Sequence, residues 1–277
     1  MAKVLVNFAD GNFQLAQQRN TSTAMEIGGC DRVVAFTPKD IGRLFCWKNR
    51  KIFRHARGAG YWLWKPYFIA RTLDRLCEGD YLIYSDAGAE FIRAIDPLIE
   101  ICDETGQDVI VFDLVHIEKR WTKRDAFILM ECDAPDFTDS RQRLASLIIC
   151  KRSRFSRDFM HEFLNYAQDD RLLTDMENQL GYPNYEGFHE HRHDQSILSL
   201  LSKKYGLMAF RDPSQFGNQM IHLHPESHYG QLMIATRARN PPPKTLRERF
   251  KATVLGRILR RAKRSVEALT RPGKPGE

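Results

Sequence analysis

The stretch GYWLWKPYFIARTLDRLCEGDYLIYSDAG at residues 60–88 predicts a helix followed by a buried strand. Pro66 suits the first turn of a helix, where its missing N–H costs nothing, and apolar residues then recur at the period that buries one helix face. The apolar and aromatic run at 81–86 predicts the strand and puts Asp86 at its carboxyl end. Ligands of open α/β sheets bind outside the carboxyl ends of strands. Asp86 is therefore either a residue that turns the chain or a residue that holds a ligand.

The first half of the chain repeats this alternation of strands and helices. Continuous apolar runs at 3–9, 31–37 and 108–114 predict buried strands, and helices are expected at 13–27 and 91–105. The second half is more irregular. We expect an α/β fold with a mostly parallel sheet flanked by helices.

Composition excludes several classes of protein. Hydrophobic residues make up 43% of the 277 residues, charged residues 28%, and the mean hydropathy is -0.46, which argues against an integral membrane protein. The first residues lack the pattern of a signal peptide, so a cytoplasmic location is expected. The six cysteines lie far apart and form no CxxC pair, which predicts reduced and mostly buried thiols rather than a zinc site or a disulfide framework.

The positive charge belongs to one end of the chain. Residues 237–277 hold 13 Lys and Arg against 3 Asp and Glu, whereas residues 1–236 hold 29 against 32. The sequence therefore predicts a body at 1–236 that does not bind nucleic acid, and a separate basic tail at 237–277.

The tail itself predicts one basic amphipathic helix. Apolar residues in 244–271 recur at spacings of three and four, and lysines and arginines fill the other faces. Such a helix is typical of a contact with an anionic membrane surface, which would make the protein peripheral on the inner face of the cell membrane. One alternative is a helix that packs on the body or on a second subunit. Another is a helix that binds nucleic acid, which the acidic body would oppose.

Two groups of polar residues could carry chemistry. Asp86, with small residues after it, could hold a divalent cation on a diphosphate. Residues 189–195, HEHRHDQ, lie in a loop that leads into a helix at 194–206. There Asp194 either caps the helix or, with Gln195, binds the hydroxyls of a sugar.

Basic and imidazole groups could supply further contacts. Lys65 begins one predicted helix, and Lys123 and Arg124 begin another within a TKRD capping box, so each could face a phosphate or simply lie in solvent. His222 and His224 alternate along MIHLHPE, which predicts that both project from one face of an extended segment. They could be metal or phosphate ligands, or the polar face of an edge strand.

Taken together, four motifs resemble those of a bacterial group of nucleotide-diphospho-sugar glycosyltransferases with the GT-A fold. They are GAGYWLWKPYFI, GDYLIYSDAG, EKRWTKRDAF and EHRHDQSILSLLSKKYG, and the resemblance runs from about residue 3 to 234. It implies a Rossmann-like donor half, an acceptor half, and transfer of a sugar from a nucleotide donor, with UDP as the expected nucleotide. In this family a strand-end DxD motif binds a divalent cation, Mn²⁺ or Mg²⁺. Asp86 matches its first aspartate, and Gly88 stands where the second would be.

That departure leaves two ways to neutralise the diphosphate. The resemblance implies either a cation held by Asp86 with His222 or His224, or phosphates contacted by Lys65 and other basic groups. HDQS at 193–196 is similar to the helix starts of several retaining families, where the acidic residue touches the transferred sugar. The resemblance thus assigns the catalytic position to Asp194 with Gln195, puts His193 beside the donor, and favours retention of the anomeric configuration.

The sequence thus predicts a hexosyltransferase that moves a sugar from a nucleotide-diphosphate donor to a glycan or lipid-linked acceptor in bacterial surface polysaccharide synthesis. Two alternatives stay open. One is a protein that binds a nucleotide sugar or glycan without catalysis, and the other is a nucleotide-sugar hydrolase or nucleotidyltransferase on a related fold.

Overall fold

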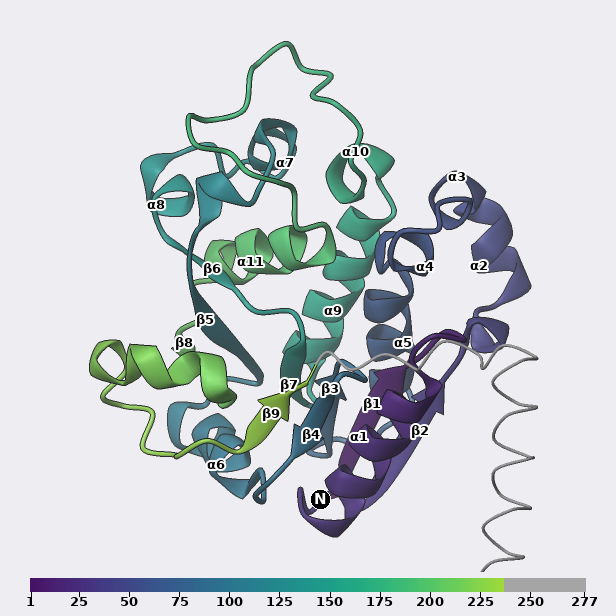
Figure 1. The fold of residues 1–277 in the computed structure, drawn as a ribbon, viewed down its shortest axis with the longest axis vertical. Helices are drawn as coiled ribbons and strands as arrows, with labels where there is room; N and C mark the ends of the chain where they lie inside the picture. The colour runs from purple at the N-terminus through teal and green to yellow at the C-terminus, as the bar shows by residue number, and fades with distance from the viewer. Residues whose placement is uncertain (237–277) are drawn as a thin grey trace, which may run out of the picture. The chain divides into compact units, whose positions relative to one another are not determined.

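The computed structural model describes residues 1–236, which form a sheet covered by helices on both faces (Figure 1). The predicted tail at 237–277, with its helix at 244–271, lies outside the described residues. Within residues 1–236, none of the helices is both long enough and apolar enough to cross a bilayer. The strands are β1 (Lys3–Phe8), β2 (Arg32–Phe36), β3 (Tyr81–Ser85), β4 (Ala89–Phe91), β5 (Val109–Ile117), β6 (Arg141–Arg143), β7 (Leu147–Lys151), β8 (Ala209–Arg211) and β9 (Met233–Ala235).

The main sheet has the strand order β2-β1-β3-β7-β5-β6, and β8 pairs with β5. Strands β1, β2, β3, β5 and β8 run in one direction, and β6 and β7 run against them. The sheet is therefore mostly parallel, as predicted. A separate two-stranded sheet pairs β4 with β9.

Helices and short 3-10 turns connect these strands. The helices are α1 (Gln14–Glu26), α2 (Arg43–Lys48), α3 (Arg50–Phe53), α4 (Gly58–Tyr61), α5 (Trp64–Leu73), α6 (Asp96–Thr105), α7 (Arg124–Leu129), α8 (Pro135–Thr138), α9 (Arg154–Ala167), α10 (Asp170–Leu173) and α11 (Asp194–Lys204). The 3-10 turns are η1 (Pro38–Asp40), η2 (Glu118–Arg120) and η3 (Gln215–Leu223).

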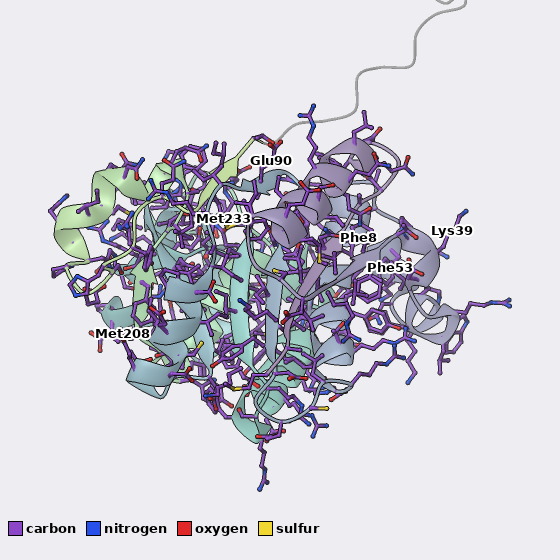
Figure 2. The ribbon with its side chains drawn as sticks, turned by 90° about the horizontal axis from the view of Figure 1, so that it is seen from below. Phe8, Lys39, Phe53, Glu90, Met208 and Met233 are labelled. Carbon is purple, nitrogen blue, oxygen red and sulfur yellow. The ribbon has the colours of Figure 1, made fainter. Side chains whose placement is uncertain are left out.

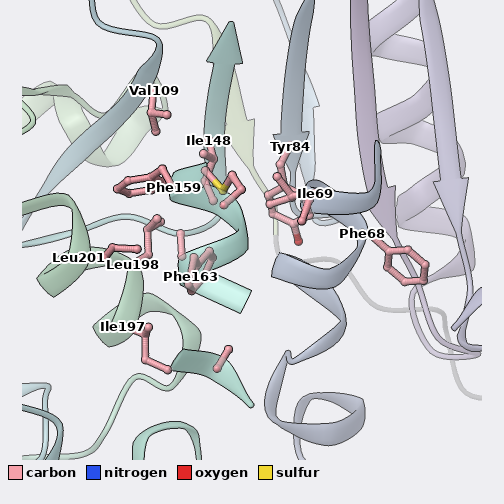
Figure 3. Packing of buried hydrophobic residues seen from close by; sticks show 14 of the residues in the cluster. Phe68, Ile69, Tyr84, Val109, Ile148, Phe159, Phe163, Ile197, Leu198 and Leu201 are labelled. Carbon is pink, nitrogen blue, oxygen red and sulfur yellow. The ribbon is translucent and has the colours of Figure 1, made fainter. Parts of the chain in front are cut away.

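Alternating side chains of the central strands pack into two hydrophobic cores, one on each face of the sheet. Leu82 and Tyr84 of β3 join the core beneath α5, α9 and α11, whereas Tyr81 and Ile83 join the core beneath α1 and α6. The same alternation holds in β1, β5 and β7, because successive side chains of a strand point to opposite faces. Figure 3 shows the first core, where Phe159 and Phe163 of α9 meet apolar residues of α11.

Several local predictions differ from the structure. The helix expected at 91–105 begins at Asp96, because residues 89–91 pair with β9 as a strand. The segment that contains His222 and His224 is not extended, since His222 lies in the 3-10 helix η3 and His224 is its C-cap. The capping box expected at 122–125 does not form at the start of α7. The N-cap residue is Lys123, whose side chain makes no capping hydrogen bond, and the Thr122 hydroxyl donates to Glu118 instead.

Most of the cysteines, which all lie within residues 1–236, are buried as predicted. All six are free thiols, and only Cys46 and Cys77 are not buried.

Candidate functional site

A cleft of about 980 Å³ opens at the carboxyl ends of the parallel strands. Its walls include the residues that follow β1, β3 and β8, the second half of β5, and the start of α11. Asp86 follows β3, Asp212 follows β8, and Asp113 is in the middle of the longer strand β5. The cleft therefore lies at the edge where an α/β sheet binds its ligands.

Lys65, Asp86 and Asp194 meet in this cleft as one ion cluster. The Lys65 Nζ lies 2.6 Å from Asp194 Oδ2 and 3.5 Å from Asp86 Oδ1. Lys65 also donates to the carbonyl oxygen of Ala145 at 3.0 Å. The hydroxyl of Tyr84 donates to Asp86 Oδ1, and the Lys65 Nζ lies 5.2 Å from the centre of the Tyr84 ring.

The members of the cluster differ in their exposure. The side chains of Lys65 and Asp194 are 4% and 6% exposed, whereas that of Asp86 is 40% exposed. Asp86 is therefore the most exposed member of the cluster, while Lys65 and Asp194 line the cleft with little of their surface open.

Burial and charge set the pKa values of the cluster. Burial raises the pKa of Asp194 to about 6, against the opposing pull of the Lys65 charge. Burial alone would lower the pKa of Lys65, but the two carboxylates reverse this and raise it. Burial also raises the pKa of Tyr84 well above its usual value, so Tyr84 stays a hydrogen-bond donor. Near neutral pH the cluster is one ammonium between two carboxylates.

His193 and Gln195 flank Asp194 in the cleft wall. The Nδ1 of His193 lies 2.8 Å from the carbonyl oxygen of Leu173, and burial lowers the pKa of His193 to about 4, so the ring is neutral. The amide of Gln195 donates to Gln142 at 2.8 Å and accepts from the backbone N–H of Ala145 at 3.4 Å. Both side chains are thus held in one orientation.

A turn of left-handed helix leads into Lys65. Five consecutive residues, Gly58 to Trp62, have φ between 50° and 94°. The backbone N–H of Tyr61 donates to the carbonyl of Arg57, and that of Trp62 donates to Gly58, in the i→i-4 pattern of a helix. Left-handed helix costs roughly 1–2 kcal/mol for each residue that carries a Cβ, and such strain concentrates at functional sites. The turn lines the cleft with Gly58, Ala59 and Trp62.

The sequence did not predict this turn or the contacts that surround it. The one local signal is the pair of glycines at 58 and 60, since glycine adopts positive φ without strain. At Gly60 an added Cβ would come within 2.6 Å of the Phe53 ring. The Trp62 ring stacks on the His193 ring, with 5.2 Å between ring centres and 25° between the planes. The turn therefore also supports His193, the residue before Asp194.

The structure brings one set of the predicted site residues together in the cleft and places another set elsewhere. Lys65, Asp86, Gly88, His193, Asp194 and Gln195 all line the cleft.

Lys123 and Arg124 do not reach the cleft. The Lys123 Nζ donates to the carbonyls of Thr174 and Met176, and burial lowers the pKa of Lys123 to about 8. Arg124 pairs with Asp133 at 2.8 Å. Both cations therefore stabilise the loop after α10 and the turn after α7. Neither lies where it could contact a phosphate in the cleft.

The predicted metal ligands are also separated. His222 is exposed on η3. The Nε2 of His224 lies 3.3 Å from Asp113 Oδ2, and its Nδ1 lies 3.0 Å from Glu226 Oε1. Neither histidine lines the cleft with Asp86. Within residues 1–236 no three His, Cys, Asp or Glu side chains are grouped to hold a metal ion. A preformed metal cage of Asp86, His222 and His224 is therefore not present there.

No protein-family model matches the sequence. No curated protein matches it either. Among solved structures, the apo form of mouse xyloside xylosyltransferase 1 is similar over 88% of this chain and 100% of its own, with 8% identity and a TM-score of 0.47.

The apo structure of the WbbM bifunctional glycosyltransferase is similar over 87% of this chain, with 9% identity and a TM-score of 0.50. This chain spans 46% of the length of WbbM. At such identity the likeness concerns the fold alone. The fold is the one found in a solved glycosyltransferase, with a mostly parallel sheet flanked by helices.

Proposed function

We propose that the protein is a glycosyltransferase that moves a sugar from a nucleotide-diphosphate donor to an acceptor. The observation that carries the proposal is the ion cluster of Lys65, Asp86 and Asp194 at the strand ends of a glycosyltransferase fold. A cleft of about 980 Å³ is at the upper end of the range for ligand sites and has room for a nucleotide sugar.

Asp194 is the residue we assign to the transferred sugar. Glycosyl transfer passes through a centre with oxocarbenium character, and a fixed carboxylate beside that centre stabilises the developing positive charge. With a pKa of about 6, Asp194 is ionised at neutral pH. Lys65 fixes its position, and Gln195, locked by Gln142, offers an amide to a sugar hydroxyl.

The net charge of the ion cluster affects how the cleft could bind the diphosphate of the donor. One lysine between two carboxylates leaves the cluster with a net charge of about -1, which would repel a diphosphate. The partly exposed carboxylate of Asp86 fits a divalent cation that arrives with the nucleotide, because Mg²⁺ is commonly bound by one or two carboxylates plus substrate phosphates. Such a cation would neutralise the leaving diphosphate.

The finer assignments extend the proposal. We propose a UDP-linked hexose as donor, a glycan or lipid-linked acceptor, retention of configuration, and a role in bacterial surface polysaccharide synthesis at the inner face of the membrane. The resemblance of the four sequence motifs supports the donor and the retention, and the basic pattern of residues 244–271 supports the membrane location and a lipid-linked acceptor.

The test is release of nucleotide from a panel of nucleotide sugars, with and without candidate acceptors. We expect turnover by the parent and a loss of at least about 100-fold in Asp194→Asn, the scale of removing one electrostatic contact to a transition state. Asp103→Asn is the matched control, because Asp103 pairs with Lys151 on the surface.

Two outcomes would favour an alternative, and two further measurements test the cation and the stereochemistry. Absence of turnover by the parent, together with equal UDP binding by the parent and Asp86→Ala, would exclude the enzyme. Release that no acceptor accelerates would indicate a hydrolase. Chelation followed by addition of Mn²⁺ or Mg²⁺ tests the cation, and the anomeric signal of the product by NMR tests retention.

A further inference from the structure

A basic segment at residues 37–54 stands out from the rest of the described chain. This segment runs from the end of β2 through α2 and α3 and contains six Lys and Arg against one Asp. The remaining residues of 1–236 contain 23 Lys and Arg against 31 Asp and Glu. The net charge of residues 1–236 is close to zero because the positive charge of this segment offsets the negative charge of the remaining residues.

The inner side of the basic segment is fixed to the body. The Phe45 ring stacks on Tyr67 with 4.2 Å between ring centres. Asn49 is buried and donates to Gln168 at 3.2 Å. Ile52 is 2% exposed. The segment is thus a firmly held part of the fold, so its outward residues are not needed to attach it.

The outer side combines apolar side chains with cations. Leu44 and Trp47 are 64% and 63% exposed, and their spacing of three puts them on the same side of α2. Within residues 1–236, no carboxylate lies at ion-pair distance from any cation of the segment. These cations are Lys39, Arg43, Lys48, Arg50, Lys51 and Arg54, all of them exposed, and Figure 2 shows Lys39 reaching away from the body.

We propose that the basic segment docks the protein on an anionic lipid surface. Tryptophan and leucine on one side of a helix, among lysines and arginines that have no carboxylate partner, have the chemistry of a helix that lies in the lipid headgroup region. Arg50 lies 5.5 Å from the centre of the Trp47 ring, so a cation accompanies this ring. The apolar tips enter the interface while the cations face lipid phosphates. The basic tail at 237–277 is a poor occupant for the same surface, because both carry positive charge.

Nucleic acid is the other polyanion that a basic surface could bind. Trp47 could stack on an unpaired base, but Leu44 would find no partner in a nucleic acid, and the acidic remainder of the body would repel the phosphate backbone. The observations therefore favour lipid.

The position of the segment links the surface to the cleft. The chain leaves α3 at Phe53 and enters the left-handed turn, whose residues Gly58, Ala59 and Trp62 line the cleft. A lipid surface on α2 and α3 would therefore lie close to the cleft entrance and could present a lipid-linked acceptor to it. This last step rests on the proposed function; the docking itself does not.

The experiment uses the full chain and vesicles of phosphatidylcholine with or without phosphatidylglycerol. Binding is followed by co-sedimentation, and tryptophan fluorescence is recorded with brominated lipids, which quench a ring that enters the bilayer. We expect binding to the anionic vesicles only, and quenching that is mostly lost in Trp47→Phe. Lys48→Glu/Lys51→Glu should weaken binding by at least about tenfold, since each basic residue near the surface adds to the attraction.

The controls separate this surface from other contacts. Arg75→Glu/Arg154→Glu changes the net charge equally at exposed positions outside the segment and should bind as the parent does. Equal quenching in Trp47→Phe and the parent would overturn the proposal, because another part of the chain would then make the contact. Equal loss in the two charge variants, absence of vesicle binding, or binding of a DNA duplex in preference to vesicles would also overturn it. None of these readouts uses a donor sugar, so they stand apart from the test of the proposed function.

Discussion

Replacement of Lys65 by methionine should destabilise the protein in a way that depends on pH. Methionine keeps most of the length of the side chain but removes the charge that lies 2.6 Å from Asp194. Removing one partner of a buried ion pair commonly costs about 3–5 kcal/mol, because the other charge stays buried without compensation.

The pKa of Asp194 sets the shape of the pH dependence. It is about 6 in the folded protein and 3.8 in solvent, so between these values the folded state binds one proton more than the unfolded state. The parent therefore loses stability as pH rises from about 4 to 6 and then stays level with respect to this group. In Lys65→Met the pKa of Asp194 rises further, and the loss continues above pH 6.

The difference between parent and variant should then be constant below pH 6 and grow by about 1.4 kcal/mol per pH unit above it. At pH 8 this adds about 3 kcal/mol, in agreement with the cost of breaking a buried pair. Urea denaturation of both proteins at pH 5, 6, 7 and 8 measures it. Lys151→Met is the matched control, because the Lys151–Asp103 pair is partly exposed and should contribute less than about 1 kcal/mol. A pH-independent difference, or one no larger than the control, would refute the assignment of a buried Lys65–Asp194 pair.

Three further predictions concern the surroundings of the site. Ala59→Gly should stabilise the fold by up to about 1 kcal/mol, because Ala59 has a φ of 51°, whereas Gly60→Ala should destabilise it through the clash with Phe53; opposite shifts of the urea midpoint would confirm the left-handed turn. Glu118→Gln should cost about 3–5 kcal/mol in the same assay, because Lys203, 2.6 Å from the fully buried Glu118, would lose its charge partner. A thiol reagent should label the exposed Cys77 in the native protein, while Cys150, whose thiol pKa burial raises far above its usual value, should react only after unfolding; early labelling of Cys150, seen by mass spectrometry, would contradict its burial.

Local patterns predicted the fold and much of the cleft. The strand at 81–86 and the helix start at Asp194 could be read from apolar periodicity, and the general position of ligands at strand ends then put Asp86 in the right place. The pairing of Lys65 with Asp194 could not be read in the same way. The two residues are far apart in the sequence, and only the order of the strands in the sheet brings them together.

The residues that were misplaced show what local patterns omit. Lys123 and Arg124 begin a helix as expected, but the carbonyls and the carboxylate that hold them belong to loops whose course the sequence does not reveal. His222 and His224 were assigned to an extended segment by their alternation, yet η3 winds this segment into a 3-10 turn. Propensities also describe right-handed helices only, so a left-handed turn has no periodic signal beyond its glycines.

Within residues 1–236, the non-glycine residues with positive φ lie in the segments beside the ion pair, with Glu131 as the exception. Trp62, with a φ of 61°, lies three residues before Lys65, and His193, with a φ of 53°, lies directly before Asp194. Their rings stack on each other, so the two unfavourable backbone conformations are held by one shared contact. A functional carboxylate must be fixed to within about 0.5 Å, and a left-handed turn packed on a buried imidazole offers less freedom than an ordinary loop. The strain is therefore best explained as the cost of fixing Lys65 and Asp194 against each other at the floor of the cleft.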